Sequence, residues 1–308
     1  MAAASAPGKL ILFGEHAVVF GEPALSMAID LRTEVYARPH PSWFADGMSL
    51  DEPRYRYVKS AIRRAWSGDP LWIEIRSMLP IGSGLGSSAA VTVATLGALH
   101  GLSSTFDGPR IAQEAFDVEQ EVQGRASPID TSTATAGGGI LVRREPREDL
   151  LWSFARDERR WSLHRCALPN LTLVVGDTGI SADTGPLVAG VKARVDRDPA
   201  AAASVREIGE IALDGLRALQ KKDLAEAGRL MSRNHVLLNR LGVGHPMLEK
   251  LVDAASRLSY GAKLTGAGGG GSMVALSDRP EHAARAIEAA GGRAFLVNLD
   301  PEGVRRIG

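Results

Sequence analysis

A glycine-rich stretch at residues 80–88, PIGSGLGSS, is the segment of this chain best suited to bind an anion. Three glycines occupy alternate positions, and Ser87 and Ser88 then begin an apolar run of helical length. Small residues let backbone N–H groups approach an anion, and the N-terminus of the following helix adds its dipole. A serine hydroxyl there can cap the helix or bind Mg²⁺ beside phosphates. The alternative is a tight strand–helix turn without any ligand.

The spacing of these glycines differs from that of the two common nucleotide motifs. The P-loop, G-x-x-x-x-G-K-[ST], requires a lysine that is absent here. The dinucleotide fingerprint is G-x-G-x-x-G, whereas these glycines follow the pattern G-x-G-x-G. The stretch therefore predicts an anion site of a different kind, and by itself it does not identify the phosphate.

A second candidate is a carboxylate on the apolar face of a helix expected over residues 109–123. Glu119 lies four residues after Ala115 and three before Val122, so helical periodicity places it on the buried face. A buried carboxylate is costly without a partner. The sequence therefore predicts either a metal ion or a salt bridge to Arg or Lys beside Glu119.

Two further charged residues stand in unusual surroundings. Asp130 lies in RASPIDTSTATAGGG, a segment rich in hydroxyl residues and glycine. It is either the N-cap of a short helix over 131–136 or a carboxylate that accepts a proton. Lys9 enters an apolar strand that is followed by Gly-Glu-His at 14–16. Taken alone, such a lysine is usually a surface residue whose stem packs on apolar neighbours.

The elements that must position these residues form an α+β chain. The helix that starts at Ser87 is expected to end before Gly101, which takes the C′ position. A composition shift at 145–170 marks the expected domain boundary. Strands are expected at 9–13, 24–38, 71–76, 137–144, 171–177 and on both sides of a glycine loop within 262–276, and helices at 56–66, 109–123 and through most of 203–259.

Composition excludes several classes of protein. The 308 residues are 44% hydrophobic and 23% charged, which is typical of a globular protein. With 36 basic and 36 acidic residues the formal net charge is zero, so no overall field attracts nucleic acid or an acidic membrane. One cysteine, Cys166, excludes a disulfide framework, and a buried thiol in a reducing compartment is expected. Without a recognisable signal peptide or an apolar run of about 18 residues, a cytoplasmic protein is expected.

Three stretches together resemble the sequence motifs of the GHMP kinases. They are APGKLILFGEHAVVFG, PIGSGLGSSAAVTVA and LTGAGGGGSMVAL, in the family's order, and the resemblance covers residues 5–276. Further stretches resemble the family members that phosphorylate mevalonate, particularly the short archaeal type. These are GEHAVVFGEPA, SPIDTSTATAGGG, DTGISADTGPLVAGV and NHVLLNRLGVGHP.

The resemblance implies a GHMP kinase fold with its active site between two domains. Residues 1–165 would form an N-terminal domain related to ribosomal protein S5 domain 2, and residues 166–308 a ferredoxin-like domain. The implied activity is ATP- and Mg²⁺-dependent phosphorylation of mevalonate at its primary alcohol. The alternatives are a kinase for phosphomevalonate or another small alcohol, and a nucleotide-binding sensor without turnover. Because members of the family often form homodimers, one is also expected here.

The resemblance also implies roles for individual residues. Asp130 would take the proton of the alcohol, and Lys9 would pair with Asp130. Ser88 and Glu119 would bind Mg²⁺. Mevalonate would contact Glu15 and His16, with Thr184 near the site and Arg125 a weaker candidate for its carboxylate. The ATP phosphates would be bound by Pro80, Ile81, Gly82, Ser83, Gly84, Leu85, Gly86, Ser87 and Ser88, with Gly268 and Gly269 closing against them.

Overall fold

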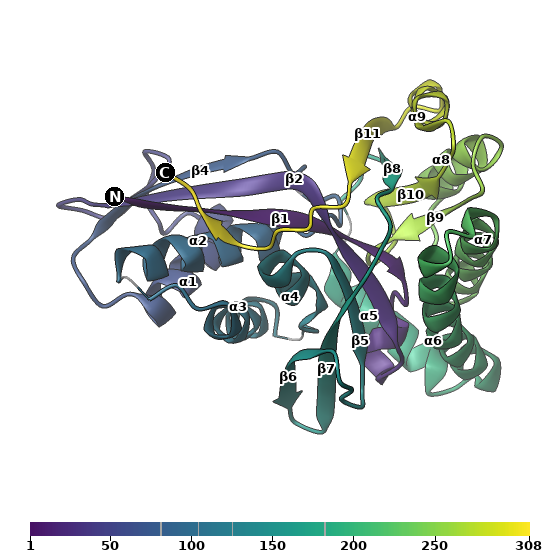
Figure 1. Ribbon diagram of the computed structural model, residues 1–308, viewed down its shortest axis with the longest axis horizontal. Coiled ribbons are helices and arrows are strands. Elements are labelled where there is room, and N and C mark those ends of the chain that lie inside the picture. The colour runs from purple at the N-terminus through teal and green to yellow at the C-terminus, as the bar shows by residue number, and fades with distance from the viewer. Residues whose placement is uncertain (81, 104, 125, 182) are drawn as a thin grey trace.

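Two β-sheets organise the chain, one formed mainly by its first half and the other by its second half (Figure 1). The computed structural model describes residues 1–308 apart from 81, 104, 125 and 182. The expected α+β class is confirmed. Within the described residues, no helix is long and apolar enough to cross a membrane.

In the part of the chain that the structure describes, the first sheet has eight strands, and its main path is β12-β1-β2-β5-β7-β6. Strand β4 also pairs with β2, and β3 adds to β4 in the only parallel pairing of this sheet among the described residues. The strands are β1 (Ala2–Phe13), β2 (Ala24–Pro39), β3 (Phe44–Ala45), β4 (Leu71–Ser77), β5 (Gly139–Arg143), β6 (Leu150–Arg156), β7 (Arg159–Cys166) and β12 (Arg305–Arg306).

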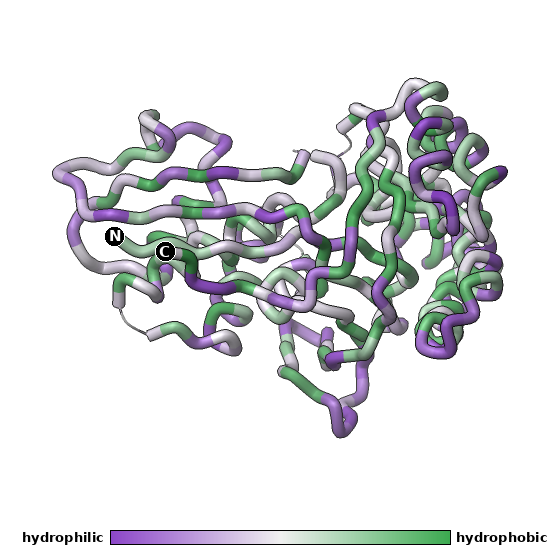
Figure 2. Tube along the Cα trace, turned by 45° about the horizontal axis from the view of Figure 1, so that its top comes forward, coloured by the Kyte–Doolittle hydropathy of each residue, from purple (hydrophilic) through white to green (hydrophobic). Residues whose placement is uncertain are grey.

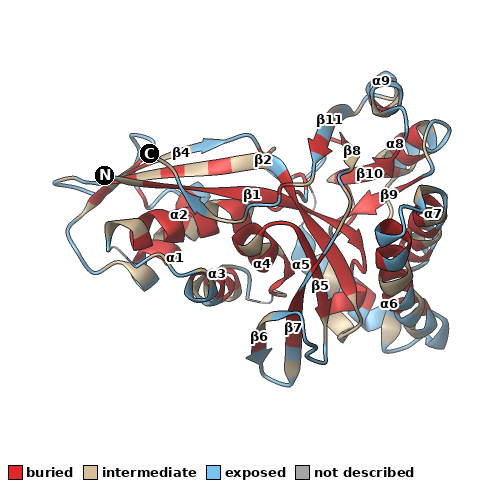
Figure 3. Cartoon of the chain, viewed as in Figure 1, coloured by how far each residue is buried: buried red, intermediate tan, exposed pale blue. Residues whose placement is uncertain are grey.

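Helices α1 to α4 lie together beside β1 and β2 (Figure 1). Helix α2 is apolar around most of its circumference, so it is buried between the sheet and its neighbouring helices, as Figure 3 shows. The helices are α1 (Arg56–Ala65), α2 (Ser87–Leu102), α3 (Gly108–Gln123) and α4 (Ile129–Ala136), with short 3₁₀ turns at Ala17–Phe20 and Pro53–Tyr55.

The second sheet has the strand order β11-β8-β10-β9, and all its neighbouring strands are antiparallel. Along the described chain, four helices separate its first two strands and one helix separates its last two. With those four helices taken as one helical segment, the order is β-α-β-β-α-β, which confirms the expected ferredoxin-like domain. The strands are β8 (Thr172–Asp177), β9 (Gly261–Thr265), β10 (Ser272–Leu276) and β11 (Arg293–Asn298).

Among the described residues, five helices follow the first strand of this sheet along the chain, and most are amphipathic. Their traces alternate between hydrophobic and hydrophilic residues in Figure 2, because one face is buried against neighbouring elements and the other meets solvent. They are α5 (Thr184–Val195), α6 (Pro199–Gln220), α7 (Leu224–Arg240), α8 (Pro246–Ser256) and α9 (Pro280–Ala289).

One expected helix end is wrong, because α2 continues through Gly101 to Leu102. A Cβ at Gly101 would lie 3.1 Å from Ala2 Cβ, and one at Gly97 would lie 2.9 Å from Ala4 Cβ. These glycines therefore let α2 pack closely on β1. The hairpin of β6 and β7 was not expected either, since it falls in the segment that the sequence marked as a boundary. The division at 165/166 itself stays a prediction.

The far end of the sequence returns to the first sheet. Asp300 N donates to Ala28 O at 3.0 Å, and Val304 N donates to Thr135 O at 3.1 Å. Strand β12 then pairs with β1, with Ala4 opposite Arg306. Residues 300–306 thus contact both the first sheet and α4, and the two chain ends lie near each other in Figure 1.

Candidate active site

The glycine loop before α2 has an unusual backbone conformation at its three glycines. Gly82, Gly84 and Gly86 have φ of 75°, 78° and 80°, a left-handed region that favours glycine. Lys9 fixes this loop, because its backbone N donates to Leu85 O at 2.9 Å and its Nζ donates to Gly84 O at 3.0 Å. A Cβ at Gly86 would lie only 2.8 Å from Lys9 Cγ. Close approach of the lysine therefore also requires glycine there.

The other residues of this loop support the same conformation. The buried Ser83 donates from Oγ to Pro80 O at 2.9 Å. Ser87 and Ser88 are half-buried and begin α2, so the N-terminal N–H groups of the helix follow the loop directly. Ile81, predicted to bind the nucleotide, lies outside the described residues.

A second glycine loop, residues 266–271, faces the first. Gly268 has φ of 79°, and a Cβ there would lie 2.1 Å from Val243 O. Gly269 N donates to the same carbonyl at 2.8 Å. A Cβ at Gly84 would lie 3.6 Å from Thr265 O and 4.0 Å from Gly266 Cα. The structure thus brings the two predicted nucleotide-binding segments together, from opposite sheets.

A cavity of about 470 Å³ adjoins the first loop at Gly82. Its other lining comes from the end of β8 with the segment that follows it, and from the turn between α9 and β11. An ion pair borders it, because Arg293 donates to Asp177 Oδ2 at 3.0 Å. The first glycine loop is therefore open to a polar space beside the second sheet.

Lys9 and Asp130, 121 positions apart, form an ion pair with Nζ and Oδ2 separated by 3.0 Å. Lys9 is 3% exposed and Asp130 is 27% exposed, so the carboxylate is the more accessible partner. Asp130 lies in the first turn of α4, whose N-cap is Pro128. The interpretation of Asp130 as an N-cap is therefore wrong. A carboxylate in a first turn is stabilised by the helix dipole.

Glu119 lies on the buried face of α3, as its periodicity predicted. Burial raises its pKa to about 8, and the charge of Asp130 adds to this rise. Lys9 and a hydrogen bond from Ser88 lower that pKa, which places all four residues in one cluster. Gln123 Nε2 donates to Glu119 Oε1 at 3.4 Å. Among the described residues, no Arg or Lys forms an ion pair with Glu119, so the salt-bridge alternative has no support there.

The turn after β1 carries two predicted substrate residues, Glu15 and His16. Glu15 is fully buried and forms an ion pair with Lys263 of β9. Burial raises the pKa of Glu15 and lowers that of Lys263, and each partner opposes the shift of the other. His16 Nε2 donates to Ala267 O at 2.9 Å, and burial lowers the pKa of its imidazole. His16 therefore contacts the second glycine loop in its neutral form.

Thr184 lies outside this cluster. Thr184 is exposed and is the first residue of α5, which Asp183 caps by accepting from Gly185 N. Arg125 lies outside the described residues. Cys166 is buried, as expected, and burial raises the pKa of its thiol to about 12.

Sequence reasoning missed Lys263. Strand β9 is buried along its whole length, and Lys263 stands in it between Ala262 and Leu264. A charged residue within an apolar strand was the available signal.

Comparisons with known proteins agree with this arrangement. The family model for the GHMP kinases N terminal domain matches residues 55–138, and the model for GHMP kinases C terminal matches residues 216–295. The mevalonate kinase of Thermococcus onnurineus is 36% identical, covering 98% of this chain and 97% of that protein. The mevalonate kinase of Archaeoglobus fulgidus is also 36% identical, covering 98% of each.

Solved structures agree as well. The crystal structure of the Methanococcus jannaschii mevalonate kinase has a TM-score of 0.81 at 28% identity, covering 96% of this chain and 98% of that one. The L. major mevalonate kinase in complex with R-mevalonate has a TM-score of 0.83 at 29% identity, covering 97% and 96%. With such identity over nearly the whole of each chain, this chain belongs to the GHMP kinase family and, within it, to the mevalonate kinases.

Proposed function

We propose that this chain transfers the γ-phosphoryl group of ATP to the primary alcohol of mevalonate. The observation that carries the proposal is the ion pair of Lys9 and Asp130 at the place where two glycine loops meet. The relatives named above are mevalonate kinases, which supports mevalonate as the substrate.

The chemistry explains why such residues are needed. In phosphoryl transfer the protein mainly positions the reactants and neutralises charge on the moving group. The N–H groups of both loops and the start of α2 suit the phosphates. Asp130 accepts the proton of the alcohol, while Lys9 pairs with Asp130 and holds the first loop through Gly84. A positioned base contributes about 10²–10⁴ in rate.

Ser88 and Glu119 are proposed to hold Mg²⁺ with the nucleotide. The buried carboxylate supports this, because its pKa is raised to about 8 and a cation would favour its ionised form. Mg²⁺ is usually held by one or two carboxylates together with substrate phosphates. When bound, the ion would neutralise charge on the phosphates.

The contacts to mevalonate remain proposals. His16 and Glu15 lie in the turn beside the second glycine loop, Thr184 is exposed at the start of α5, and Arg125 is outside the described residues. Of these residues, His16 contacts the second glycine loop directly, through Ala267 O.

A coupled assay of ADP release tests the function with mevalonate, phosphomevalonate, galactose and homoserine. A site built to hydrogen-bond its substrate rejects analogues strongly, so kcat/KM for mevalonate should exceed the others by at least about 10²-fold. A higher value for phosphomevalonate would overturn the substrate but not the kinase activity. If no alcohol releases ADP, the chain is a nucleotide-binding sensor.

A further inference from the structure

Lys263 is a charged residue to which the proposed chemistry gives no role. Its side chain is fully buried in β9, where it pairs with the equally buried Glu15 and donates to Leu264 O at 2.7 Å. Asn234 of α7 adds a weaker contact, from Nδ2 to Glu15 Oε2 at 3.4 Å. Burying two charges is costly even when they are paired. The pair therefore calls for an explanation beyond simple packing.

The pair lies in a line of contacts that join the two sheets. Thr265 Oγ1 donates to Ile11 O at 3.0 Å, and His16 Nε2 donates to Ala267 O at 2.9 Å. The ion pair of Lys263 and Glu15 is thus one of three side-chain contacts between two segments. One segment is residues 11–16, the end of β1 and the turn after it, and the other is residues 263–267, the end of β9 and the start of its loop. These contacts hold the turn at more than one point.

The turn needs such support because His16 has φ of 60°. A residue other than glycine keeps this left-handed conformation only where its surroundings impose it, and such positions cluster at functional sites. Glu15 immediately precedes His16, so the ion pair fixes the backbone on one side while Ala267 O holds the imidazole on the other.

We propose that Lys263 is a positioning residue of the phosphoryl-transfer site, which holds Glu15 and thereby fixes the turn that presents His16 to the alcohol substrate. This inference rests on the proposed function. The competing explanation is that the pair only fastens the two sheets. The two explanations predict different KM values for mevalonate when both charges of the pair are removed together.

The experiment compares Lys263→Met with Lys263→Met/Glu15→Gln, measuring Tm and the KM for mevalonate and for ATP. The single variant leaves a buried carboxylate unpaired and should lower Tm, whereas the double variant should recover most of that loss. If Lys263 positions the turn, the KM for mevalonate stays raised about tenfold in both variants, since the ion pair is absent from both. The KM for ATP should remain within about twofold of wild type.

Asp300→Asn is the matched control, because Asp300 forms another largely buried ion pair, with Arg32, in which each side chain is 11% exposed. It should lower Tm and leave both KM values unchanged. A double variant with recovered Tm and a wild-type KM for mevalonate would overturn the positioning role. So would an equal rise in the KM for ATP.

Two further measurements keep the test decisive. If neither Lys263 variant folds, Asn234→Ala loosens Glu15 while keeping the ion pair, and we expect the KM for mevalonate to rise about threefold. An unchanged value would overturn the proposal. Wild-type protein in the same assay separates the two hypotheses, because failure to phosphorylate mevalonate would refute the proposed function itself.

Discussion

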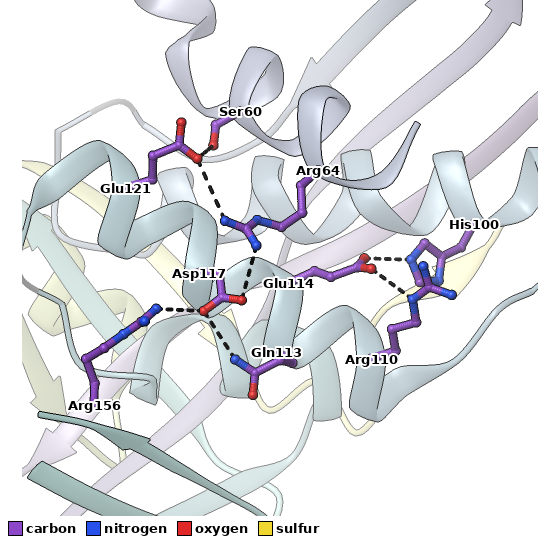
Figure 4. Close-up of polar contacts among 9 residues, drawn as sticks. All are labelled: Ser60, Arg64, His100, Arg110, Gln113, Glu114, Asp117, Glu121 and Arg156. Carbon is purple, nitrogen blue, oxygen red and sulfur yellow. Dashed lines mark hydrogen bonds and ion pairs between the residues drawn. The ribbon is translucent and has the colours of Figure 1, made fainter. Parts of the chain in front are cut away.

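Helix α3 carries carboxylates on two faces, and the surroundings of these faces differ sharply. On the outer face, Asp117 accepts from Arg64 of α1 at 3.3 Å and from Arg156 of β6 at 2.8 Å, as Figure 4 shows. Glu121 accepts from Ser60 of α1 at 2.7 Å. On the inner face, Glu119 is buried and has no ion pair with Arg or Lys among the described residues.

The difference between the two faces of α3 indicates which carboxylates have a structural role and which one is a candidate for a role in catalysis. The outer carboxylates pair with cationic side chains. Exposed ion pairs contribute only about 0–1 kcal/mol each to the stability of the fold, because water and salt screen them. These pairs link α1 and β6 to α3. The inner carboxylate is kept in a place where its ionisation is unfavourable, beside Asp130, Lys9 and Ser88. Burial without an ion pair to Arg or Lys among the described residues, rather than charge alone, distinguishes the carboxylate that is proposed to bind Mg²⁺.

The largest effect is expected from Lys9 and Asp130, the proposed catalytic pair beside the inner face of α3. Asp130→Asn and Lys9→Met should each lower kcat by at least about 10²-fold, because one removes the base and the other its partner. ATP should still bind. Steady-state kinetics and a direct measurement of ATP affinity check both statements. Near-normal kcat in both variants would show that this pair takes no part in the mechanism. The inner face of α3 would then have no functional distinction from the outer face.

An intermediate effect is expected from the inner carboxylate of α3. Glu119→Gln should retain the fold and raise the Mg²⁺ concentration for half-maximal activity by at least about tenfold, since a proposed ligand is lost. A titration of activity with Mg²⁺ at saturating ATP measures this. If the Mg²⁺ dependence stays as in wild type and only Tm changes, Glu119 has a purely structural role.

The smallest effect is expected from the outer face, where Glu121→Gln is the matched variant on the same helix. It should change the free energy of unfolding by no more than about 1 kcal/mol, because the side chain is 42% exposed. Chemical denaturation and the same Mg²⁺ titration test it. A shift in Mg²⁺ dependence as large as that of Glu119→Gln would show that the two faces are not functionally distinct.

Local pattern predicted much of this architecture. The position of Glu119 followed from helical periodicity, and the start of α2 after the glycine loop followed from the sequence pattern at 80–88. The ferredoxin-like order came from the resemblance, since strand pairing joins residues far apart and leaves little local trace. The end of α2 was wrong because Gly101 serves packing against β1 rather than termination of the helix.

The contacts within the site were harder to predict than the elements. The pairing of Lys9 with Asp130 spans the first domain, and no periodicity links the two residues, so only the resemblance pointed to it. Lys263 was missed because its partner, Glu15, lies 248 positions away on another sheet. Burial of a lysine is decided by tertiary structure, which the composition of its strand does not reveal.

The return of residues 300–306 to the first sheet affects how the chain folds as it is synthesised. A Cβ at Gly303 would lie 1.9 Å from Thr135 O, so this segment packs directly against α4, the helix that carries Asp130. Domains generally fold as units during synthesis, the N-terminal one first. Here the first sheet lacks β12, and α4 lacks this packing, until the ribosome has translated the whole second sheet. Asp130 therefore reaches its final surroundings only after the second sheet has been translated.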